Sequence, residues 1–168
     1  MFTFIKWCHI RINYPTNQHI RSLIFIGLII FFASHHKTAI SNPLITYPIK
    51  IGENSLRVEV ANNAELRRRG LMKRTSLSPN RGMIFIFPQE QRISMWMKDT
   101  PIDLTVLFID SQGIIINIAH MKRESLEHHA SAGPAKYALE INSDSPLAKR
   151  IKPGVLVLGL TEIPPAKN

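Results

Sequence analysis

Apolar and polar residues alternate along two neighbouring segments, residues 47–52 and 55–61. Successive side chains of a strand point to opposite faces, so this alternation predicts two half-buried strands. Glu53 and Asn54 separate the two runs, an arrangement that is typical of a β-hairpin. The predicted domain therefore begins with two paired strands.

A short basic helix is predicted to follow. Asn62 or Asn63 can cap its first turn through the side-chain oxygen, and Gly70 can end it in the left-handed conformation. The last turn holds three consecutive arginines, residues 67–69. Consecutive helical residues lie about 100° apart around the axis. These three side chains therefore fan out and cannot all face one ligand.

The apolar pattern predicts further strands over residues 82–87, 92–97, 104–109, 114–119, 137–141 and 155–160. A second short helix is expected over residues 145–150, and the Pro-rich tail from Thr161 is expected to be loose. About eight short strands, joined by turns and accompanied by two short helices, indicate a mainly β fold of the β-rich α+β kind. We expect a partly closed antiparallel sheet or barrel.

The N-terminal segment has the pattern of an export signal. Three basic residues precede a run of eleven residues, 23–33, that contains no polar side chain. Such a run is too short to cross a bilayer, which takes about 20 residues, but it suits the apolar region of a signal peptide. We expect the domain to be exported, so that it is periplasmic or secreted.

Cleavage after Ser41 would remove residues 1–41 and leave a domain over residues 42–160, with a C-terminal tail over 161–168. If the leader is retained instead, residues 22–34 would anchor the chain in the membrane. That segment would then be the only expected membrane contact. The sequence leaves the oligomeric state open.

The exported part is basic and contains no cysteine. The leader holds Cys8, four of the 21 lysines and arginines, and none of the 12 acidic residues of the chain. The remaining 17 basic and 12 acidic residues give a net charge of +5. This balance favours anionic neighbours such as acidic glycans, lipid head groups or anionic metabolites. Export would separate the domain from nucleic acids, so nucleic acid is not an expected partner.

The polar loop after Trp96 is the leading candidate for a ligand-binding site, because it contains Lys98, Asp99, Thr100 and Asp103. An exposed indole beside such a loop could stack on a sugar ring. Two carboxylates in different environments could act as general acid and base, which would make the protein a hydrolase that uses Asp99 and Asp103. Alternatively, Asp99 and Thr100 cap the turn and the tryptophan belongs to the core.

Arg69 and Arg74 lie in a dense basic segment close to this candidate site in the sequence. Part of that segment could bind an anion together with the polar loop. The alternatives are a solvated surface, or a structural ion pair formed by either arginine.

No metal or cofactor site is expected. The histidines and acids that could supply ligands are His120, His128, His129, Glu124 and Glu127. Their spacing matches no metal-binding helix motif, and the segment has the composition of a loop. The chain also lacks a Gly-rich phosphate loop and a G-x-S-x-G nucleophile motif. No catalytic residue is therefore assigned.

Six short blocks occur in an order that resembles one known family, DUF192 (UPF0127). They are Val58-Glu59-Val60-Ala61, Arg69-Gly70-Leu71-Met72, Gly82-Met83-Ile84-Phe85, Met95-Trp96-Met97-Lys98-Asp99-Thr100, Leu107-Phe108-Ile109-Asp110 and Tyr137-Ala138-Leu139-Glu140. The resemblance implies a compact, mainly β domain of a kind commonly exported in prokaryotes. It brings no reaction, ligand or catalytic residue. The family usually has an acidic residue at the position of Thr105, and here Asp103 lies two residues earlier.

The sequence thus predicts an exported ligand-binding or accessory module of the cell envelope, with an anionic or sugar-like ligand. The alternative from the residues alone is the carboxylate-based hydrolase. A protein that binds partners through a flat, exposed apolar patch is a third class.

Overall fold

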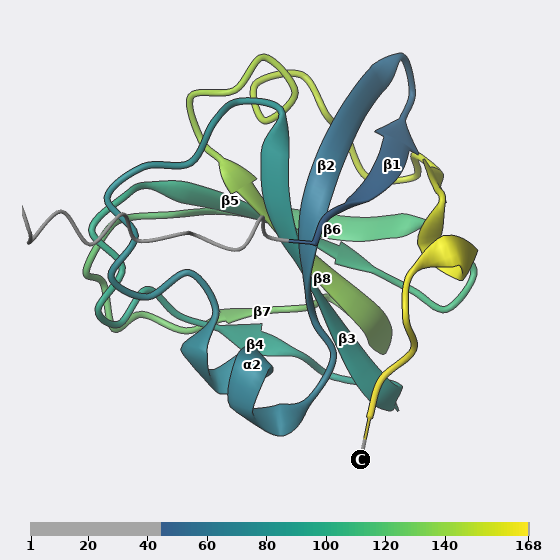
Figure 1. Cartoon of the computed structure of the whole chain (residues 1–168), viewed down its shortest axis with the longest axis horizontal. Helices are drawn as coiled ribbons and strands as arrows, with labels where there is room; N and C mark the ends of the chain where they lie inside the picture. Colours follow the sequence, from purple (N-terminus) through teal and green to yellow (C-terminus); the bar gives the residue numbers. More distant parts are fainter. Residues whose placement is uncertain (1–44, 168) are drawn as a thin grey trace, which may run out of the picture. The chain divides into compact units, whose positions relative to one another are not determined.

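The computed structural model describes residues 45–167 (Figure 1), and the predicted leader lies outside these residues. The strands are β1 (Tyr47–Ile51), β2 (Asn54–Ala61), β3 (Arg81–Gln91), β4 (Ser94–Met95), β5 (Leu104–Ile109), β6 (Ile115–Met121), β7 (His129–Ala130), β8 (Ala135–Asn142) and β9 (Val157–Leu158). The helices are α2 (Ala64–Arg69) and the 3₁₀ helix η1 (Leu160–Glu162). Within the described residues no helix is both long and apolar enough to span a bilayer.

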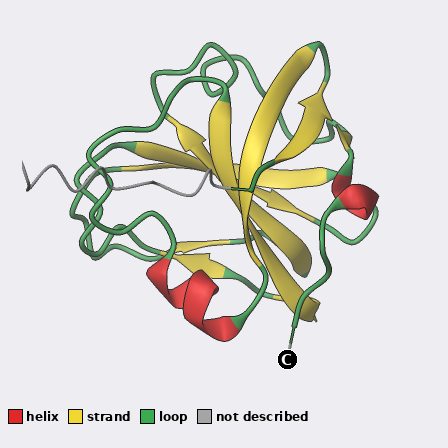
Figure 2. Ribbon diagram, viewed as in Figure 1, coloured by secondary structure: helices red, strands yellow, loops and turns green. Residues whose placement is uncertain are grey.

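Seven strands form one curled sheet in the order β6-β5-β8-β3-β2-β1-β9 (Figure 2). An antiparallel bridge between Ile114 and Leu156 links the segments beside β6 and β9, the two outermost strands. The backbone N–H of Val157 also donates to the carbonyl of Gly113 at 2.8 Å. The sheet therefore closes at one end, which confirms the predicted partly closed, mainly β architecture.

One strand pair departs from the expected antiparallel, turn-linked arrangement. β2 and β3 are parallel, with Val58 opposite Gly82 and Ala61 opposite Phe85. A parallel pair requires the chain to return to the end at which it started, so a crossover must join the two strands. The segment that carries α2 provides this crossover and lies beside β4 and β7 (Figure 1).

The caps predicted for the first helix are confirmed. The Asn63 side chain accepts a hydrogen bond from the backbone N–H of Leu66 at 2.8 Å, and Gly70 has a positive φ of 46°. The second expected helix, over residues 145–150, is instead a series of turns. Ser145 caps this segment, because its hydroxyl accepts a hydrogen bond from the backbone N–H of Ala148 at 3.1 Å.

The C-terminal tail is not loose, contrary to expectation. Ile163 is buried, and the tail is tied to Asn62 by two hydrogen bonds. The Asn62 side chain donates to the carbonyl of Pro165 at 2.9 Å, and the N–H of Lys167 donates to the Asn62 carbonyl at 2.7 Å. The tail therefore belongs to the folded domain.

Each face of the sheet carries its own apolar core, and β8 contributes to both. Leu139 and Ile141 belong to the core on one face, whereas Ala138 belongs to the core on the other. Strand alternation places Glu140 on the second face. Across the ladder Glu140 is paired with Met83 of β3 and Val106 of β5. An acidic side chain therefore lies inside an apolar layer.

The close approach of β3 to β8 gives a stability prediction. A Cβ added at Gly82 would lie 2.7 Å from the carbonyl oxygen of Glu140. We expect Gly82→Ala to reduce the free energy of unfolding by about 1–3 kcal/mol, because the backbone must shift. Gly133→Ala is the matched control, since nothing lies within 4 Å of a Cβ there. Urea unfolding that shows equal stability for the two variants would contradict the packing described here.

Candidate ligand-binding site

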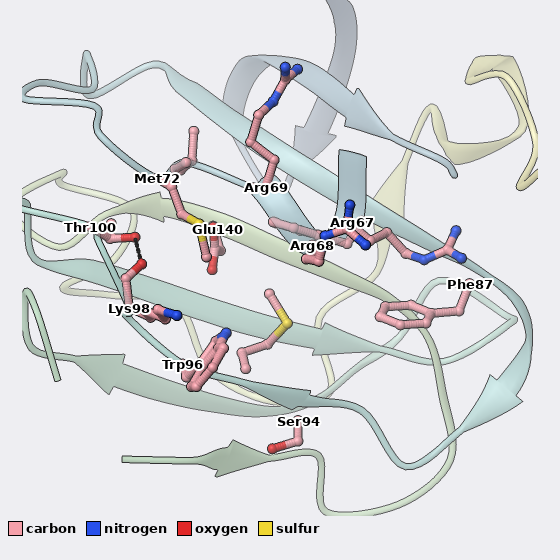
Figure 3. Close-up of a pocket in the computed structure, with 14 residues that line it drawn as sticks. Arg67, Arg68, Arg69, Met72, Phe87, Ser94, Trp96, Lys98, Thr100 and Glu140 are labelled. Atoms are coloured by element: carbon pink, nitrogen blue, oxygen red, sulfur yellow. Dashed lines mark hydrogen bonds between the residues drawn. The ribbon is translucent and has the colours of Figure 1, made fainter. Parts of the chain in front are cut away.

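A pocket of about 270 Å³ opens on the second face of the sheet, next to α2 and β4 (Figure 3). Its lining combines basic, apolar and aromatic side chains around one carboxylic acid. The lining residues are Arg67, Arg68, Arg69, Gly70, Leu71, Met72, Phe85, Phe87, Ser94, Met95, Trp96, Lys98, Thr100 and Glu140. Four of the seven residues predicted for binding line this pocket, namely Arg69, Trp96, Lys98 and Thr100. The other three, Arg74, Asp99 and Asp103, do not.

Glu140 is the buried acid of this pocket. Its exposed fraction is 4%, and in the view of Figure 3 it lies between Met72 and Trp96. Burial raises the pKa of this carboxyl from its ordinary 4.5 to about 8. At neutral pH the group is therefore mainly a neutral acid, which can donate one hydrogen bond as well as accept.

Trp96 forms an exposed aromatic wall of the pocket. Its neighbours Met95 and Met97 are buried, and strand-like alternation leaves the indole 42% exposed. The Lys98 ammonium lies 5.7 Å from the indole centroid, within cation–π range. His128 stacks on the indole at 5.5 Å and 24°. Of the two alternatives given for Trp96, the structure displays the exposed indole and not the core tryptophan.

The loop after Trp96 is held in place by backbone contacts. The N–H of Lys73 donates to the Asp99 carbonyl at 2.6 Å, and the Thr100 carbonyl accepts from the N–H of Glu124 at 3.0 Å. The Thr100 hydroxyl donates to the Lys98 carbonyl at 3.1 Å. Thr100 is buried, so it shapes the turn and lines the pocket, as the capping alternative predicted in part.

A second depression of about 510 Å³ adjoins the pocket. The two share Arg68, Arg69, Met72, Trp96 and Lys98, and the second adds Glu65, Lys73 and Asp99. Together they form one continuous recess with basic residues along its rim.

The three arginines of α2 point in different directions, as the helical geometry predicts. Arg67 donates to the Ile86 carbonyl at 3.0 Å, and its guanidinium lies 5.3 Å from the Phe87 ring centroid. Arg68 and Arg69 are exposed. In Figure 3 the guanidinium of Arg69 is directed away from Glu140. Arg68 and Lys98 are therefore the cations best placed to meet a ligand.

Arg74 has a structural partner. Both of its terminal nitrogens contact the Glu59 carboxylate in a bidentate ion pair, with one N···O distance of 2.6 Å. Planar bidentate pairs of this kind are among the stronger charged contacts. The ion-pair alternative for Arg74 is therefore the one that the structure displays, and this residue lines neither part of the recess.

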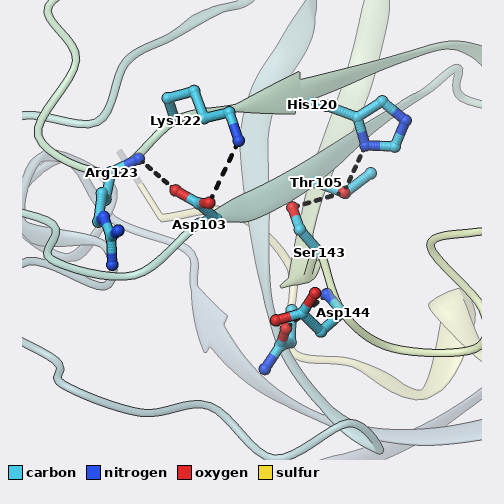
Figure 4. Close-up of polar contacts among 8 residues, drawn as sticks. Asp103, Thr105, His120, Lys122, Arg123, Ser143 and Asp144 are labelled. Atoms are coloured by element: carbon cyan, nitrogen blue, oxygen red, sulfur yellow. Dashed lines mark hydrogen bonds and ion pairs between the residues drawn. The ribbon is translucent and has the colours of Figure 1, made fainter.

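Asp103 lies beside Lys122 and Arg123 (Figure 4). It accepts from the N–H of Arg123 at 2.8 Å and faces Lys122 at 3.5 Å. The backbone hydrogen bond from Arg123, with a smaller contribution from Lys122, lowers the pKa of this exposed carboxyl. Asp103 lines a separate depression of about 210 Å³. The two carboxylates proposed for acid–base chemistry therefore do not share a pocket.

Thr105 occupies the position at which the resembled family usually has an acid. Its hydroxyl is 2.9 Å from Nδ1 of His120 and 3.0 Å from the hydroxyl of Ser143 (Figure 4). His120 and Ser143 line the same depression as Asp103. Thr105 thus keeps a buried polar contact in place of a charge.

Across residues 45–167 no three His, Cys, Asp or Glu side chains converge to hold a metal ion. The histidines singled out in the sequence are separated: His128 contacts Trp96 and the Ser94 hydroxyl, whereas His120 contacts Thr105.

Glu140 was not among the site residues predicted from the sequence. The available signal was an acid within the apolar run 137–141, on the same side of the strand as Ala138. Its burial depends on the neighbours that β3 and β5 supply, and strand pairing determines these.

The profile of the DUF192 family, described as Uncharacterized ACR, COG1430, matches residues 47–158. No curated protein matches the chain. A crystal structure of a candidate transcription regulator from Sinorhizobium meliloti 1021 is similar, with a TM-score of 0.65 and 30% identity, over 69% of this chain and 95% of that one. A protein of unknown function from Novosphingobium aromaticivorans DSM 12444 has a TM-score of 0.64 and 32% identity, over 70% and 88% of the two chains.

The buried acid predicts how stability depends on pH. Between pH 4.5 and about 8 the folded protein keeps the Glu140 proton that the unfolded chain has released, so stability falls as pH rises. The amide that Glu140→Gln introduces cannot ionise. We therefore expect the free energy of unfolding of this variant, relative to that of the native protein, to grow across this window. At roughly 1.4 kcal/mol per pH unit, the advantage reaches on the order of 5 kcal/mol at most.

Urea unfolding of both proteins at pH 5, 6.5 and 8 measures this difference. Glu53→Gln, which removes an exposed carboxylate from the β1–β2 turn, is the matched control. A Glu140→Gln advantage that stays constant over the three pH values would show that Glu140 is ionised in the folded protein.

Proposed function

This chain belongs to the DUF192 family, and we propose that it is an exported ligand-binding or accessory module of the cell envelope. Its ligand is an anionic or sugar-like molecule that binds in the recess between α2 and Trp96. The family description names no activity, so the proposal depends on the geometry of the recess.

The observation that carries the proposal is a neutral, buried acid facing a cavity beside an exposed indole. Small-molecule sites are typically concave and mostly apolar, with a few polar groups that fix the orientation of the ligand. Titratable groups with strongly displaced pKa values are concentrated at such sites. Glu140 has a pKa of about 8 and lines the same pocket as Trp96, so this pocket meets both descriptions.

The charge at the rim favours an anion. Among the described residues Arg68, Arg69 and Lys98 form no salt bridge, so their charges are available to a ligand. The second part of the recess also contains Lys73. Glu65 and Asp99 partly offset these cations, which favours a ligand of low net charge over a highly charged polyanion.

The hydrolase alternative receives no support from the placement of its residues. Asp99 lines the recess, whereas Asp103 lines a separate depression and accepts a backbone hydrogen bond. In glycoside hydrolysis by two carboxyl groups, the two groups lie on opposite sides of the glycosidic bond that is cleaved, roughly 5–9.5 Å apart.

Ligand binding is tested with a thermal-shift screen of acidic monosaccharides, neutral monosaccharides and small organic anions. We expect a subset of the anions to stabilise the protein. Trp96→Ala should weaken their binding about 5- to 150-fold by the loss of stacking, about 1–3 kcal/mol as for other ring–aromatic contacts. Lys98→Gln should weaken the binding of anions more than the binding of neutral sugars.

Leu126→Ala, which removes another exposed apolar side chain, and Lys152→Gln, which removes an exposed lysine outside the recess, are the matched controls. Duplex DNA serves as a further probe, because the similar Sinorhizobium protein is described as a candidate transcription regulator. Stabilisation by DNA alone, or by anions regardless of Trp96, would overturn the proposed function.

Export is tested separately by expressing the full chain and fractionating the cells. We expect the protein outside the cytoplasm, with a mature N-terminus at Asn42 by mass spectrometry, since cleavage after Ser41 leaves the described domain intact. Replacing Ile26 and Ile29 with arginine should block export, because it interrupts the apolar run. A full-length protein in the cytoplasm would contradict the proposal.

A further inference from the structure

The two ends of the pocket offer different chemistry to a ligand. Arg68 and Lys98 lie at its rim and carry positive charge, whereas Glu140 is buried within it and is mainly neutral. One ligand that satisfies both ends must carry an anionic group at one end and an uncharged polar group at the other.

The group that meets Glu140 is best an uncharged hydrogen-bond acceptor. A neutral carboxylic acid has one O–H donor, and Glu140 lines the pocket. A ligand carbonyl that reaches this carboxyl can accept a hydrogen bond from it. A second carboxylate there would face apolar neighbours, Met83 and Val106, and would remain poorly solvated.

The middle of the pocket suits a ring. Trp96 presents its indole beside Met72, and Phe85 and Phe87 add apolar surface to the lining. His128 and Lys98 contact the indole from their own positions, which fixes its orientation. The pocket volume of about 270 Å³ is near the lower limit of ligand sites, roughly 300–1,000 Å³, so it accommodates a single ring.

We propose that the ligand is an N-acylated sugar acid, whose carboxylate meets Lys98 and Arg68, whose ring stacks on Trp96 and whose acyl carbonyl accepts a hydrogen bond from Glu140. This inference rests on the proposed function and specifies its ligand. The larger depression beside Asp99 is continuous with the pocket, so further sugar units attached to the same ring have space to extend.

The proposal is tested by calorimetry with three sugars that differ in whether they carry a carboxylate, an N-acyl group or both. N-acetylmuramic acid has the carboxylate and the amide, N-acetylglucosamine lacks the carboxylate, and glucuronic acid lacks the amide. We expect N-acetylmuramic acid to bind at least tenfold more tightly than either of the others. Lys98→Gln should reduce this advantage over N-acetylglucosamine, whereas Lys152→Gln, which removes an exposed lysine outside the recess, should leave it unchanged.

The contribution of Glu140 is tested by its dependence on pH. Between pH 7 and 9.5 the affinity of the native protein for N-acetylmuramic acid should fall about tenfold per unit above pH 8, as the donor proton is lost. Glu140→Gln keeps a donor in its amide group and should show no such fall.

The other titratable groups near Glu140 are Arg67, Arg68 and Arg69 on α2, Lys98 on the loop, and His128, which stacks on Trp96. The neighbours of Glu140 on the flanking strands, Met83 and Val106, are apolar. His128→Gln and Lys98→Gln should therefore keep the pH dependence of the native protein. Loss of the pH dependence in either variant would show that it does not arise from Glu140.

The outcomes separate the two proposals. If glucuronic acid binds as tightly as N-acetylmuramic acid and Trp96→Ala abolishes both, the recess binds anions but the acylated-sugar inference is wrong. If none of the three probes binds and Trp96→Ala has no effect on any ligand, both are wrong.

Discussion

The burial of the Glu140 carboxyl between β3 and β5 is the constraint on which the site depends. Its neighbours across the ladder, Met83 and Val106, are apolar, so the group keeps its proton at neutral pH instead of carrying a charge. For stability alone an apolar side chain of similar volume would serve better at this position. Natural proteins accept lower stability at functional sites, and the proposed ligand site beside Glu140 would give the acid such a function.

The remaining parts of the pocket come from segments far apart in the sequence, and the fold brings them together. The parallel pairing of β2 and β3 requires a crossover, and this crossover places α2 at the rim. β4 pairs with β7 in a small second sheet, and Trp96 follows β4 directly. A hydrogen bond of 3.0 Å from the N–H of Met97 to the Ser125 carbonyl then fixes the loop that carries Lys98. The recess is thus built on backbone pairings, which hold the ligand-facing side chains in defined positions.

Local features were predictable from the sequence, whereas those that depend on distant pairings were not. The β1–β2 hairpin, the Asn63 cap and the Gly70 terminus follow from short-range propensities, and the structure confirms them. The alternation around Trp96 likewise indicated that one face is exposed. The parallel β2–β3 pair and the role of Glu140 depend on which strands become neighbours, and one strand's pattern does not contain that information. The separation of Asp99 from Asp103 arises at the turn between them, where Asp99 has a positive φ of 53°.

The distribution of partners among charged residues leaves basic side chains at the recess without salt bridges, although the domain has many acids. Asp103 and Asp110 each accept backbone N–H groups, at 2.8–2.9 Å, and Glu59 pairs with Arg74. These carboxylates are engaged in shaping turns or fixing a cation. In contrast, Arg68 and Lys98 form no salt bridge among the described residues. Part of the basic excess of the domain therefore lies at the recess, where its field would guide the proposed anionic ligand towards Trp96 and Glu140.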